Sequence, residues 1–384
     1  MSELRRLAVL TTGRQDYGIL RSTLELLGET GQPDVALWAG GMLLSERFGR
    51  AIDLVRADGL TVSRELPFVS DPPDQTRDTA RALAAVGDAL AEDRPDALML
   101  VGDRYETAAA AIAATLARVP IVHLHGGEET EGAIDNAFRH AITKLSHLHL
   151  VSHPAYAARV RQMGEPDASV IIVGSPGTDN LYRDDLPSIA DLEKRLGRAL
   201  TPPIVLVTMH PTTLGGDPRA ETNAVAEAMA RVNATYVITA PNTDTGGTAI
   251  DDVWRAWTAP RANALYVDAL GATNYWALLR ATAAVLGNSS SGILEAPSAG
   301  VPVVNVGDRQ QGRIRMGWVR DVPAETDRIE AALREALAAG APERASGRGG
   351  ADVPRGPVAP RIVDALRAWD LPCPPRKRFV ERVP

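Results

Sequence analysis

The stretch from Ala97 to Glu128, ALMLVGDRYETAAAAIAATLARVPIVHLHGGE, decides the fold of this chain. Its two ends, residues 97–102 and 120–125, are short runs rich in apolar residues without regular polar alternation, which is typical of strands buried on both faces. Residues 105–118, between them, are rich in alanine and have the period of a helix. A strand, a helix and a second strand in this order predict a parallel sheet that is covered by helices.

The same alternation of apolar runs and helical segments continues through most of the chain. Further strands are predicted at residues 7–12, 35–40, 148–152, 170–174, 204–210, 235–242, 263–270, 283–290 and 301–307. The pattern pauses in a polar segment with prolines, residues 175–203. We therefore expect two α/β domains, residues 1–175 and 201–355, with a linker over 176–200 and a terminal helix and tail over 356–384.

Composition excludes several classes of protein. The chain has 384 residues, a length that is enough for two domains, and its 45% hydrophobic and 23% charged residues are typical of globular proteins. The net charge of −7 argues against a nucleic-acid-binding protein. The single cysteine, Cys373, excludes internal disulfides and fits a reducing compartment. No apolar run has the length of a signal peptide or a membrane span, so we expect a cytoplasmic protein without a membrane partner.

Residues that directly follow the predicted strands are the candidates for chemistry, because open α/β sheets bind ligands outside the carboxyl ends of their strands. In this chain these positions carry glycine, charged or hydroxyl side chains. They are Arg14, residues 102–104, residues 125–128, His210, residues 241–247, residues 287–292 and residues 307–313. Two sheets whose carboxyl ends faced each other would enclose a polar cleft, which is the expected site.

The segment GNSSSG, residues 287–292, is the clearest signal for a phosphate. It lies between a predicted buried strand and a predicted helix, so backbone N–H groups and hydroxyls gather where the helix dipole favours an anion. Glu295, expected one turn inside that helix, is placed to accept hydrogen bonds from a ribose diol. The alternative is an ordinary serine N-cap followed by an acidic residue, a common device of stability.

Two other motifs have competing interpretations. His123 and His125 would point to the same side of a strand and could bind a metal, but Asp103 is the only nearby candidate for a third ligand, so we expect no metal site. Arg14 follows a glycine at the end of the first strand, where it could bind a diphosphate with two hydrogen bonds or lie on the surface. The same segment, TTGRQDYG, lacks the GxGxxG spacing of a dinucleotide site, so no nicotinamide cofactor is expected.

Several motifs together resemble the UDP-N-acetylglucosamine 2-epimerase family. They lie at residues 101–152, 207–213, 241–247 and 287–313. The resemblance implies the glycosyltransferase-B fold, in which two Rossmann-like domains hold a UDP-sugar and the C-terminal domain binds most of the nucleotide. It also implies a homodimer or homotetramer, and no cofactor.

The resemblance also implies roles for individual residues. It places catalytic residues at Asp103, Asp135 and His210. It places contacts to the substrate and nucleotide at Arg14, Arg104, Asn242, Ser289, Ser290, Glu295 and Arg313. Several members of the family have a glutamate where this chain has His125, and many have an acid where it has Asn136. The role of the missing carboxylate would then pass to Glu128 or to His125 itself.

The implied reaction accounts for the many charged residues in HLHGGEETEGAIDNAFRH, residues 123–140. Inverting C2 of a sugar nucleotide without a redox cofactor requires a base for the C2 proton and an acid or water-activating group on the opposite face. Expelling the diphosphate requires cations and hydrogen-bond donors. Asp103, Asp135 and either His125 or Glu128 would be the acid/base groups. The cations and donors would be Arg14, Arg104, His210 and the serines.

The motifs resemble the hydrolysing branch of the family, so we expect UDP and free N-acetylmannosamine, or a deoxy analogue, as products. Re-addition of UDP, which would give UDP-N-acetylmannosamine, is the alternative, and a UDP- or GDP-linked diacetamido-trideoxy sugar is an alternative substrate. A glycosyltransferase of the same fold would share the serine turn and Glu295 but would not need the acids of the N-terminal half. A nucleotide-sugar sensor without activity would not need them either.

Overall fold

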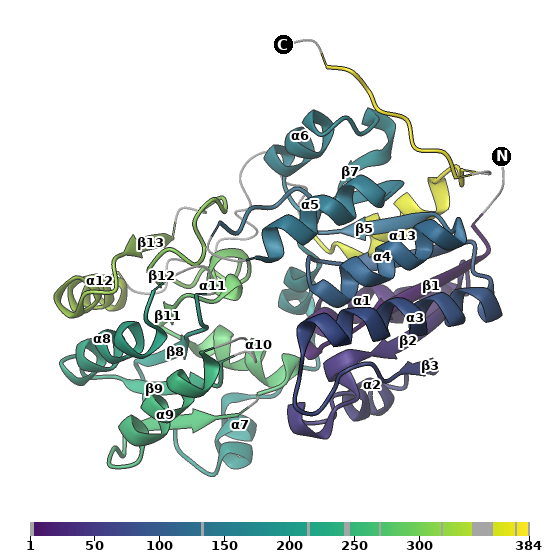
Figure 1. Ribbon diagram of the computed structural model, residues 1–384. Coiled ribbons are helices and arrows are strands. Elements are labelled where there is room, and N and C mark those ends of the chain that lie inside the picture. Colours follow the sequence, from purple (N-terminus) through teal and green to yellow (C-terminus); the bar gives the residue numbers. More distant parts are fainter. Residues whose placement is uncertain are drawn as a thin grey trace. The chain divides into compact units, whose positions relative to one another are not determined.

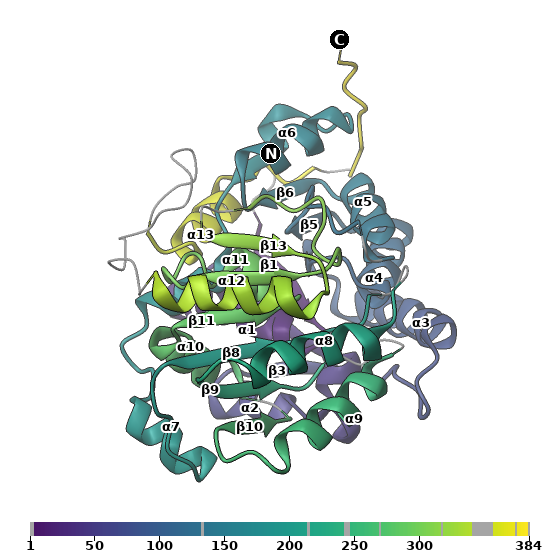
Figure 2. The same ribbon diagram turned by 90° about the vertical axis from the view of Figure 1, so that its left-hand side faces the viewer.

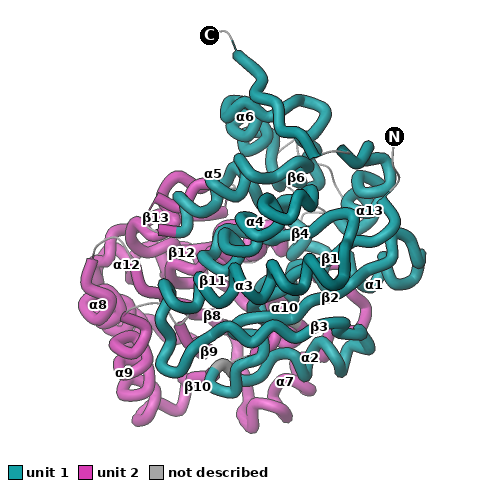
Figure 3. Tube along the Cα trace, turned by 45° about the vertical axis from the view of Figure 1, so that its right-hand side comes forward, with its two compact units in different colours: residues 1–128, 135–179, 352–384 teal, residues 129–134, 180–351 magenta. Residues whose placement is uncertain are grey.

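The computed structural model describes residues 4–131, 134–212, 216–241, 246–268, 270–315, 318–339, 356–372 and 375–382. The chain divides into two compact units (Figure 3). The first unit comprises residues 1–128, 135–179 and 352–384, and the second comprises residues 129–134 and 180–351. Each unit has its own parallel sheet and its own hydrophobic core.

The first unit contains a seven-stranded sheet in the order β3-β2-β1-β4-β5-β6-β7. Strands β1, β2, β3, β5 and β7 of this sheet are labelled in Figure 1. Every neighbouring pair is parallel. The strands are β1 (Arg6–Thr11), β2 (Asp34–Gly40), β3 (Val62–Leu66), β4 (Ala97–Val101), β5 (Ile121–Leu124), β6 (Leu148–Val151) and β7 (Val170–Ile172). Its helices are α1 (Arg14–Thr30), α2 (Ile52–Ala57), α3 (Gln75–Asp93), α4 (Tyr105–Ala117), α5 (Asp135–Leu145), α6 (Pro154–Gln162) and α13 (Ala359–Ala368).

Both faces of this sheet are buried, as the apolar runs predict. Along β1, Leu7 and Val9 pack into one core with residues of α1 and α13. Ala8 and Leu10, which alternate with them, pack into a second core with residues of α3 and α4. Successive side chains of a strand point to opposite faces, so a strand covered on both sides is mostly apolar along its whole length.

The second unit contains a six-stranded parallel sheet in the order β10-β9-β8-β11-β12-β13. Its strands are β8 (Ile204–Thr208), β9 (Thr235–Thr239), β10 (Ala264–Val267), β11 (Ala284–Gly287), β12 (Val303–Val306) and β13 (Val319–Val322). Its helices are α7 (Ile189–Leu196), α8 (Pro218–Ala230), α9 (Gly247–Thr258), α10 (Ala272–Ala281), α11 (Ser290–Leu294) and α12 (Thr326–Ala338). Helices α8, α9 and α12 share one core and cover one face (Figure 2), whereas α7 and α10 contribute to the core on the other.

The segment expected as a linker is part of the structure of the units. It contains a 3₁₀ helix, Pro176–Tyr182, and helix α7, whose Leu192 is buried in the second unit. The terminal helix α13 packs against α1 in the first unit. The carboxylate of Asp179 accepts hydrogen bonds from the backbone N–H groups of Val358 and Ala359, at 2.5 and 2.7 Å, at the start of α13. Among the described helices, none is both long and apolar enough to span a membrane.

Each sheet has one point where the order of its strands reverses direction. In the first unit this point lies between β1 and β4, and in the second it lies between β8 and β11. Ligands of open α/β sheets bind at such points, outside the carboxyl ends of the strands. Arg14 and Asp103 follow the two strands of the first reversal, and His210 and Ser289 follow those of the second. The topology therefore places predicted site residues at the favoured position in each unit.

Gly287, the last residue of β11, has a backbone conformation that excludes a side chain. Its φ is +134°, and a Cβ there would lie 2.0 Å from the carbonyl oxygen of Thr208 on the neighbouring strand. The close approach of the two strands at this reversal therefore requires glycine.

We expect Gly287→Ala to lower the free energy of unfolding of the second unit by at least about 2 kcal/mol, because the strand must shift and the backbone becomes strained. Urea unfolding followed by tryptophan fluorescence measures the effect. Gly28→Ala is the control: that glycine is inside α1, and a Cβ there meets no atom within 4 Å. The control should be neutral or up to about 1 kcal/mol more stable. Equal stabilities of the two variants would contradict the assignment.

Candidate active site

A buried arginine, Arg139 of α5, organises the acidic residues of the first unit. It is 2% exposed and forms an ion pair with the carboxylate of Asp103, which follows β4. Its Nη1 also donates a hydrogen bond to the backbone carbonyl of Glu128, at 3.0 Å, and another to the side-chain oxygen of Asn136, at 3.2 Å. One guanidinium thus joins the residues after β4 to those after β5.

The sequence indicated no structural partner for Asp103, and Arg139 was not among the predicted site residues. A signal was present, because Arg139 is four residues after Asp135, and residues four apart on a helix share a face. Asp135 itself is the first residue of α5 and is half-buried.

His125 and Glu128 form a hydrogen-bonded pair. The Nδ1 atom of His125 lies 2.7 Å from Oε1 of Glu128, and the hydroxyl of Ser152 donates to the same oxygen at 2.8 Å. Both members are buried, at 7% and 2% exposure. When Glu128 is ionised it can only accept, so Nδ1 carries the hydrogen and Nε2 of the neutral ring presents a lone pair. Within the described residues this buried Nε2 has no hydrogen-bond partner.

His123 has a structural role that differs from the metal-binding alternative. Its Nε2 donates to the carbonyl of Gly102 at 2.8 Å, and its Nδ1 lies 3.3 Å from the hydroxyl of Thr143. Burial lowers the pKa of this fully buried histidine to about 3, so it is neutral near pH 7. His123 thereby holds the residue that precedes Asp103.

The expectation that His123 and His125 lie on one face of a strand is wrong. Strand β5 ends at Leu124, and His125 has a φ of +67°, in the left-handed region. The alternation of side chains therefore does not continue to His125. No group of three or more His, Cys, Asp or Glu side chains in the described part of the chain is arranged to hold a metal ion.

Two arginines stand at the reversal point of the first sheet. Arg104 is the N-cap residue of α4, and its Nε donates to a carboxylate oxygen of the fully buried Glu106 at 2.7 Å. Arg14 is the first residue of α1, and burial lowers its pKa. Asp16, two residues later, accepts a hydrogen bond from the hydroxyl of Thr12 at 2.8 Å, and burial raises the pKa of its carboxyl. Two cationic side chains are therefore set among buried acids at this point.

In the second unit, His210 and Asn288 connect the two strands of the reversal. The backbone N–H of His210 donates to the side-chain oxygen of Asn288 at 2.7 Å, and the side-chain amide of Asn288 donates to the carbonyl of His210 at 2.9 Å. Burial, together with the charge of Arg309, lowers the pKa of His210 well below its ordinary value. The imidazole is therefore neutral near pH 7 and can donate one hydrogen bond.

Ser289 is the N-cap of α11, which was the alternative interpretation of the serine turn. Its hydroxyl accepts from the backbone N–H of Ser291 at 3.4 Å, and the hydroxyl of Tyr275 donates to that of Ser291 at 2.6 Å. Glu295 was expected one turn inside a helix, but α11 is only five residues long and Glu295 is its C-cap. Burial raises the pKa of Tyr275, and the charge of Glu295 raises it further, so the two side chains are near each other.

Arg313 lies in the loop after β12 and donates from Nη2 to the hydroxyl of Thr130 at 3.1 Å. The backbone N–H of Glu131 donates to the carbonyl of Gln311 at 3.1 Å in the same region. Residues 129–134 thus belong to the second unit, although Glu128 and Asp135 on either side of them in the sequence belong to the first. Asn242 lies outside the described residues.

The structure therefore groups the predicted residues in two sets, one in each unit. In the first unit, Arg139 connects Asp103 to the segment that holds His125 and Glu128. In the second, Asn288 connects His210 to Ser289, and Ser290 begins the helix that Ser289 caps.

Two parallel sheets of this kind, each with polar residues at its reversal point, define a glycosyltransferase-B type of architecture. A family model described as UDP-N-acetylglucosamine 2-epimerase matches residues 27–367 of the chain. The chain belongs to this enzyme family.

Relatives of known name agree with this assignment. The chain is 34% identical over 339 residues to the hydrolysing UDP-N,N′-diacetylbacillosamine 2-epimerase of Legionella pneumophila, covering 87% of this chain and 89% of the relative. It is 32% identical over 317 residues to the hydrolysing GDP/UDP-N,N′-diacetylbacillosamine 2-epimerase of Campylobacter jejuni, covering 81% and 82%. The crystal structure of UDP-GlcNAc 2-epimerase from Neisseria meningitidis bound to UDP-GlcNAc has a TM-score of 0.78 at 16% identity, covering 94% and 99%. At that identity the likeness concerns the fold alone.

The lowered pKa of His123 predicts a defined pH dependence of stability. The unfolded chain takes up a proton at this histidine below about pH 6.5, whereas the folded protein does so only near pH 3. The contribution of the neutral, buried His123 to the free energy of unfolding is therefore complete above pH 6.5. It is lost as the pH falls toward 3, with a slope of up to about 1.4 kcal/mol per pH unit. His123→Gln should reduce the slope of the free energy of unfolding between pH 6.5 and 4.5 by up to this amount.

Urea unfolding at a series of pH values measures this slope in the wild type and the variant. His147, whose pKa burial lowers to about 4, provides a second case, since His147→Gln should flatten the profile down to about pH 4. Parallel profiles for wild type and His123→Gln would contradict the assignment of a neutral, buried His123.

Proposed function

We propose that the protein inverts C2 of a UDP-linked 2-acetamido sugar without a cofactor, by eliminating UDP and then adding water. The products would be UDP and a free manno-configured 2-acetamido sugar. The observation that carries the proposal is the linkage, through Arg139, of the Asp103 carboxylate to the His125–Glu128 segment. Removing the proton from C2 and activating the water that attacks C1 require two acid/base groups held in fixed positions.

In the first half-reaction a base takes the proton from C2, the bond between C1 and the diphosphate oxygen breaks, and a 2-acetamidoglycal and UDP form. Asp103 is the proposed base, because the charge of Arg139 favours its ionised form. Asp135, at the start of the same helix as Arg139, is the second proposed carboxylate. In the second half-reaction the oxygen of water bonds to C1, and C2 receives a proton on the opposite face.

The His125–Glu128 pair is proposed to serve this second half-reaction. The Nε2 lone pair of His125 would take a proton from the water that attacks C1, while Glu128 stabilises the imidazolium through Nδ1. The missing carboxylate of the family pattern is thereby replaced by a histidine with a carboxylate behind it. The hydroxyl of Ser152 donates to the same oxygen of this carboxylate and helps to hold it in place.

Departure of UDP is proposed to rest on cations and hydrogen-bond donors that the family resemblance assigns to the diphosphate. Arg14 and Arg104 would stabilise the charge that develops on the diphosphate, and Ser289 and Ser290 would donate hydrogen bonds to it. His210, with its lowered pKa, would act as a neutral donor. The assignments of Glu295, Asn242 and Arg313 to the nucleotide rest on the family resemblance, as does a homodimeric or homotetrameric assembly.

The hydrolytic outcome is supported by the names of the relatives at 32% and 34% identity, which both include the word hydrolysing. Those names also make a UDP-linked diacetamido-trideoxy sugar a second candidate substrate beside UDP-N-acetylglucosamine.

Phosphorus and proton NMR in D₂O test the reaction. With the preferred substrate and no acceptor, we expect free UDP and a free manno-configured sugar that carries one deuterium at C2, because solvent supplies the returning proton. UDP-N-acetylglucosamine and UDP-N,N′-diacetylbacillosamine are compared in parallel. A UDP-linked manno sugar without free UDP would overturn the hydrolytic step, and silence of both substrates until an acceptor is added would indicate a glycosyltransferase instead.

Asp103→Asn should reduce turnover by about 10²–10⁴-fold, the usual contribution of one acid/base group. UDP binding, measured by calorimetry, should remain close to that of the wild type. The amide oxygen can still accept from Arg139, so the fold is expected to persist, and thermal unfolding checks this. Asp96→Asn is the control, since this carboxylate stands at the other end of the same strand, where it accepts from the backbone N–H groups of Arg5 and Arg6. Turnover of Asp103→Asn equal to that of the control would remove Asp103 from the mechanism.

A further inference from the structure

The first unit has a pocket of about 460 Å³ at the amino ends of its strands, whereas the candidate active site lies at their carboxyl ends. His147 and Leu148 line it at the start of β6, and Ser169 lines it just before β7, so it lies at the amino ends of these strands. The C-terminal segment, residues 375–382, contributes one wall and the end of α13 another. Its volume is in the range of small-molecule sites.

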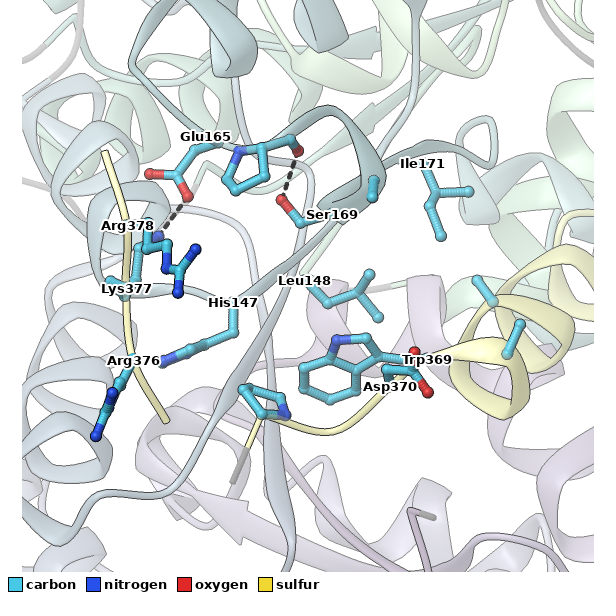
Figure 4. A pocket seen from close by; sticks show the side chains of 15 residues that line it. His147, Leu148, Glu165, Ser169, Ile171, Trp369, Asp370, Arg376, Lys377 and Arg378 are labelled. Carbon is cyan, nitrogen blue, oxygen red and sulfur yellow. Dashed lines mark hydrogen bonds and ion pairs between the residues drawn. The ribbon is translucent and has the colours of Figure 1, made fainter. Parts of the chain in front are cut away.

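The lining divides into a basic end and an apolar end (Figure 4). Arg376, Arg378 and His147 lie toward one end, whereas Trp369 and Ile171 lie toward the other. Such a division suits a ligand with a charged group at one end and an apolar group at the other.

The basic wall is fixed in place, because the C-terminal segment is anchored to the body of the unit. The ammonium of Lys377 pairs with the carboxylate of Glu165 and donates to the carbonyl of Ser146. The backbone N–H of Val380 donates to the carbonyl of Gly164 at 2.9 Å, and Arg382 pairs with Asp167 at 2.7 Å. Arg376 and Arg378 flank the anchored lysine and are thereby held at the pocket.

The positive charge at this end is in excess. Glu165 is the carboxylate near it, and this residue already pairs with Lys144 and Lys377 and with the ring of His149. In the described part of the chain, no hydrogen bond or ion pair involves the guanidinium of Arg376 or Arg378. Asp370 stands at the Trp369 end, where it would repel an anionic group and so favour its placement at the other end (Figure 4).

His147 adds a donor that lacks an acceptor. Its Nδ1 accepts a hydrogen bond from the backbone N–H of Ile121 at 3.2 Å, so the hydrogen of the neutral ring is on Nε2. This Nε2 is buried and has no partner among the described residues. A buried donor without an acceptor costs free energy, which an anionic oxygen would recover.

We propose that this pocket binds a small phosphate monoester with a flat apolar body, separately from the candidate active site. The phosphate would lie at Arg376, Arg378 and His147, and the ring would lie against Trp369 and Leu148. Because the pocket is formed partly by the C-terminal segment, the ligand would also stabilise the attachment of that segment. The site would thus be a second binding site, whose occupation does not depend on the proposed reaction.

Calorimetric titration of the whole protein with phenyl phosphate tests the proposal, with inorganic phosphate as the ligand that lacks the ring. We expect one phenyl phosphate site with an affinity that the variant Arg376→Gln/Arg378→Gln lowers by at least about tenfold, the effect of losing one charge-assisted hydrogen bond. Trp369→Ala should weaken phenyl phosphate but leave inorganic phosphate unchanged. Thermal unfolding verifies that each variant is folded.

Arg367→Gln is the matched control, because Arg367 is another arginine near the C-terminus, on α13 but outside the pocket, where it donates to the carbonyl of Gln32. The control should bind phenyl phosphate as the wild type does. Unchanged binding in the double variant, or the absence of saturable heat, would overturn the site. Equal affinity of the wild type for phenyl phosphate and inorganic phosphate would overturn the role of the apolar end.

Discussion

The candidate active site of the first unit depends on a single buried guanidinium, that of Arg139. A charge in this position is costly unless it is paired and hydrogen-bonded, and Asp103, Asn136 and the carbonyl of Glu128 are the partners of its two Nη groups. These three partners come from the turn after β4, from α5 and from the loop after β5. The geometry of the acids is therefore imposed by the need to satisfy one buried cation, and not by the loops alone.

Most of the fold follows from the sequence because the central strands are buried on both faces. Such strands are continuous apolar runs, and this pattern predicted β1, β2 and β4 in the first unit as well as β8 and β11 in the second. The two strands that were missed, β3 and β13, are edge strands whose exposed positions carry polar residues. Their sequences, VSREL and VRDV, are short and lack a long apolar run, so periodicity does not separate them from loops.

The site was predictable where position in the sheet determines it, and not where contacts across the chain do. Asp103 and His210 were named as candidates because each follows a predicted buried strand, and the structure places both beside a reversal of strand order. The pairing of Asp103 with Arg139, and of His210 with Asn288, joins residues far apart in the sequence, and their types alone do not reveal it. The left-handed backbone of His125 could not be predicted from the sequence either, since a non-glycine residue with positive φ is uncommon and no neighbouring residue indicates it.

The two departures from the family pattern, Asn136 and His125, can be explained together. An acid in place of Asn136 would share the guanidinium of Arg139 with Asp103 and draw part of its charge away, whereas the neutral amide accepts a hydrogen bond and leaves the charge to Asp103. At the other position, a glutamate is replaced by His125, and the carboxylate of Glu128 stands behind the ring. A carboxylate that acts through an imidazole orients the ring, while the ring exchanges the proton. The chain therefore has one acid, Asp103, beside the charge of Arg139 and another, Glu128, behind a histidine. In the proposed reaction this arrangement would assign the two proton transfers to separate groups.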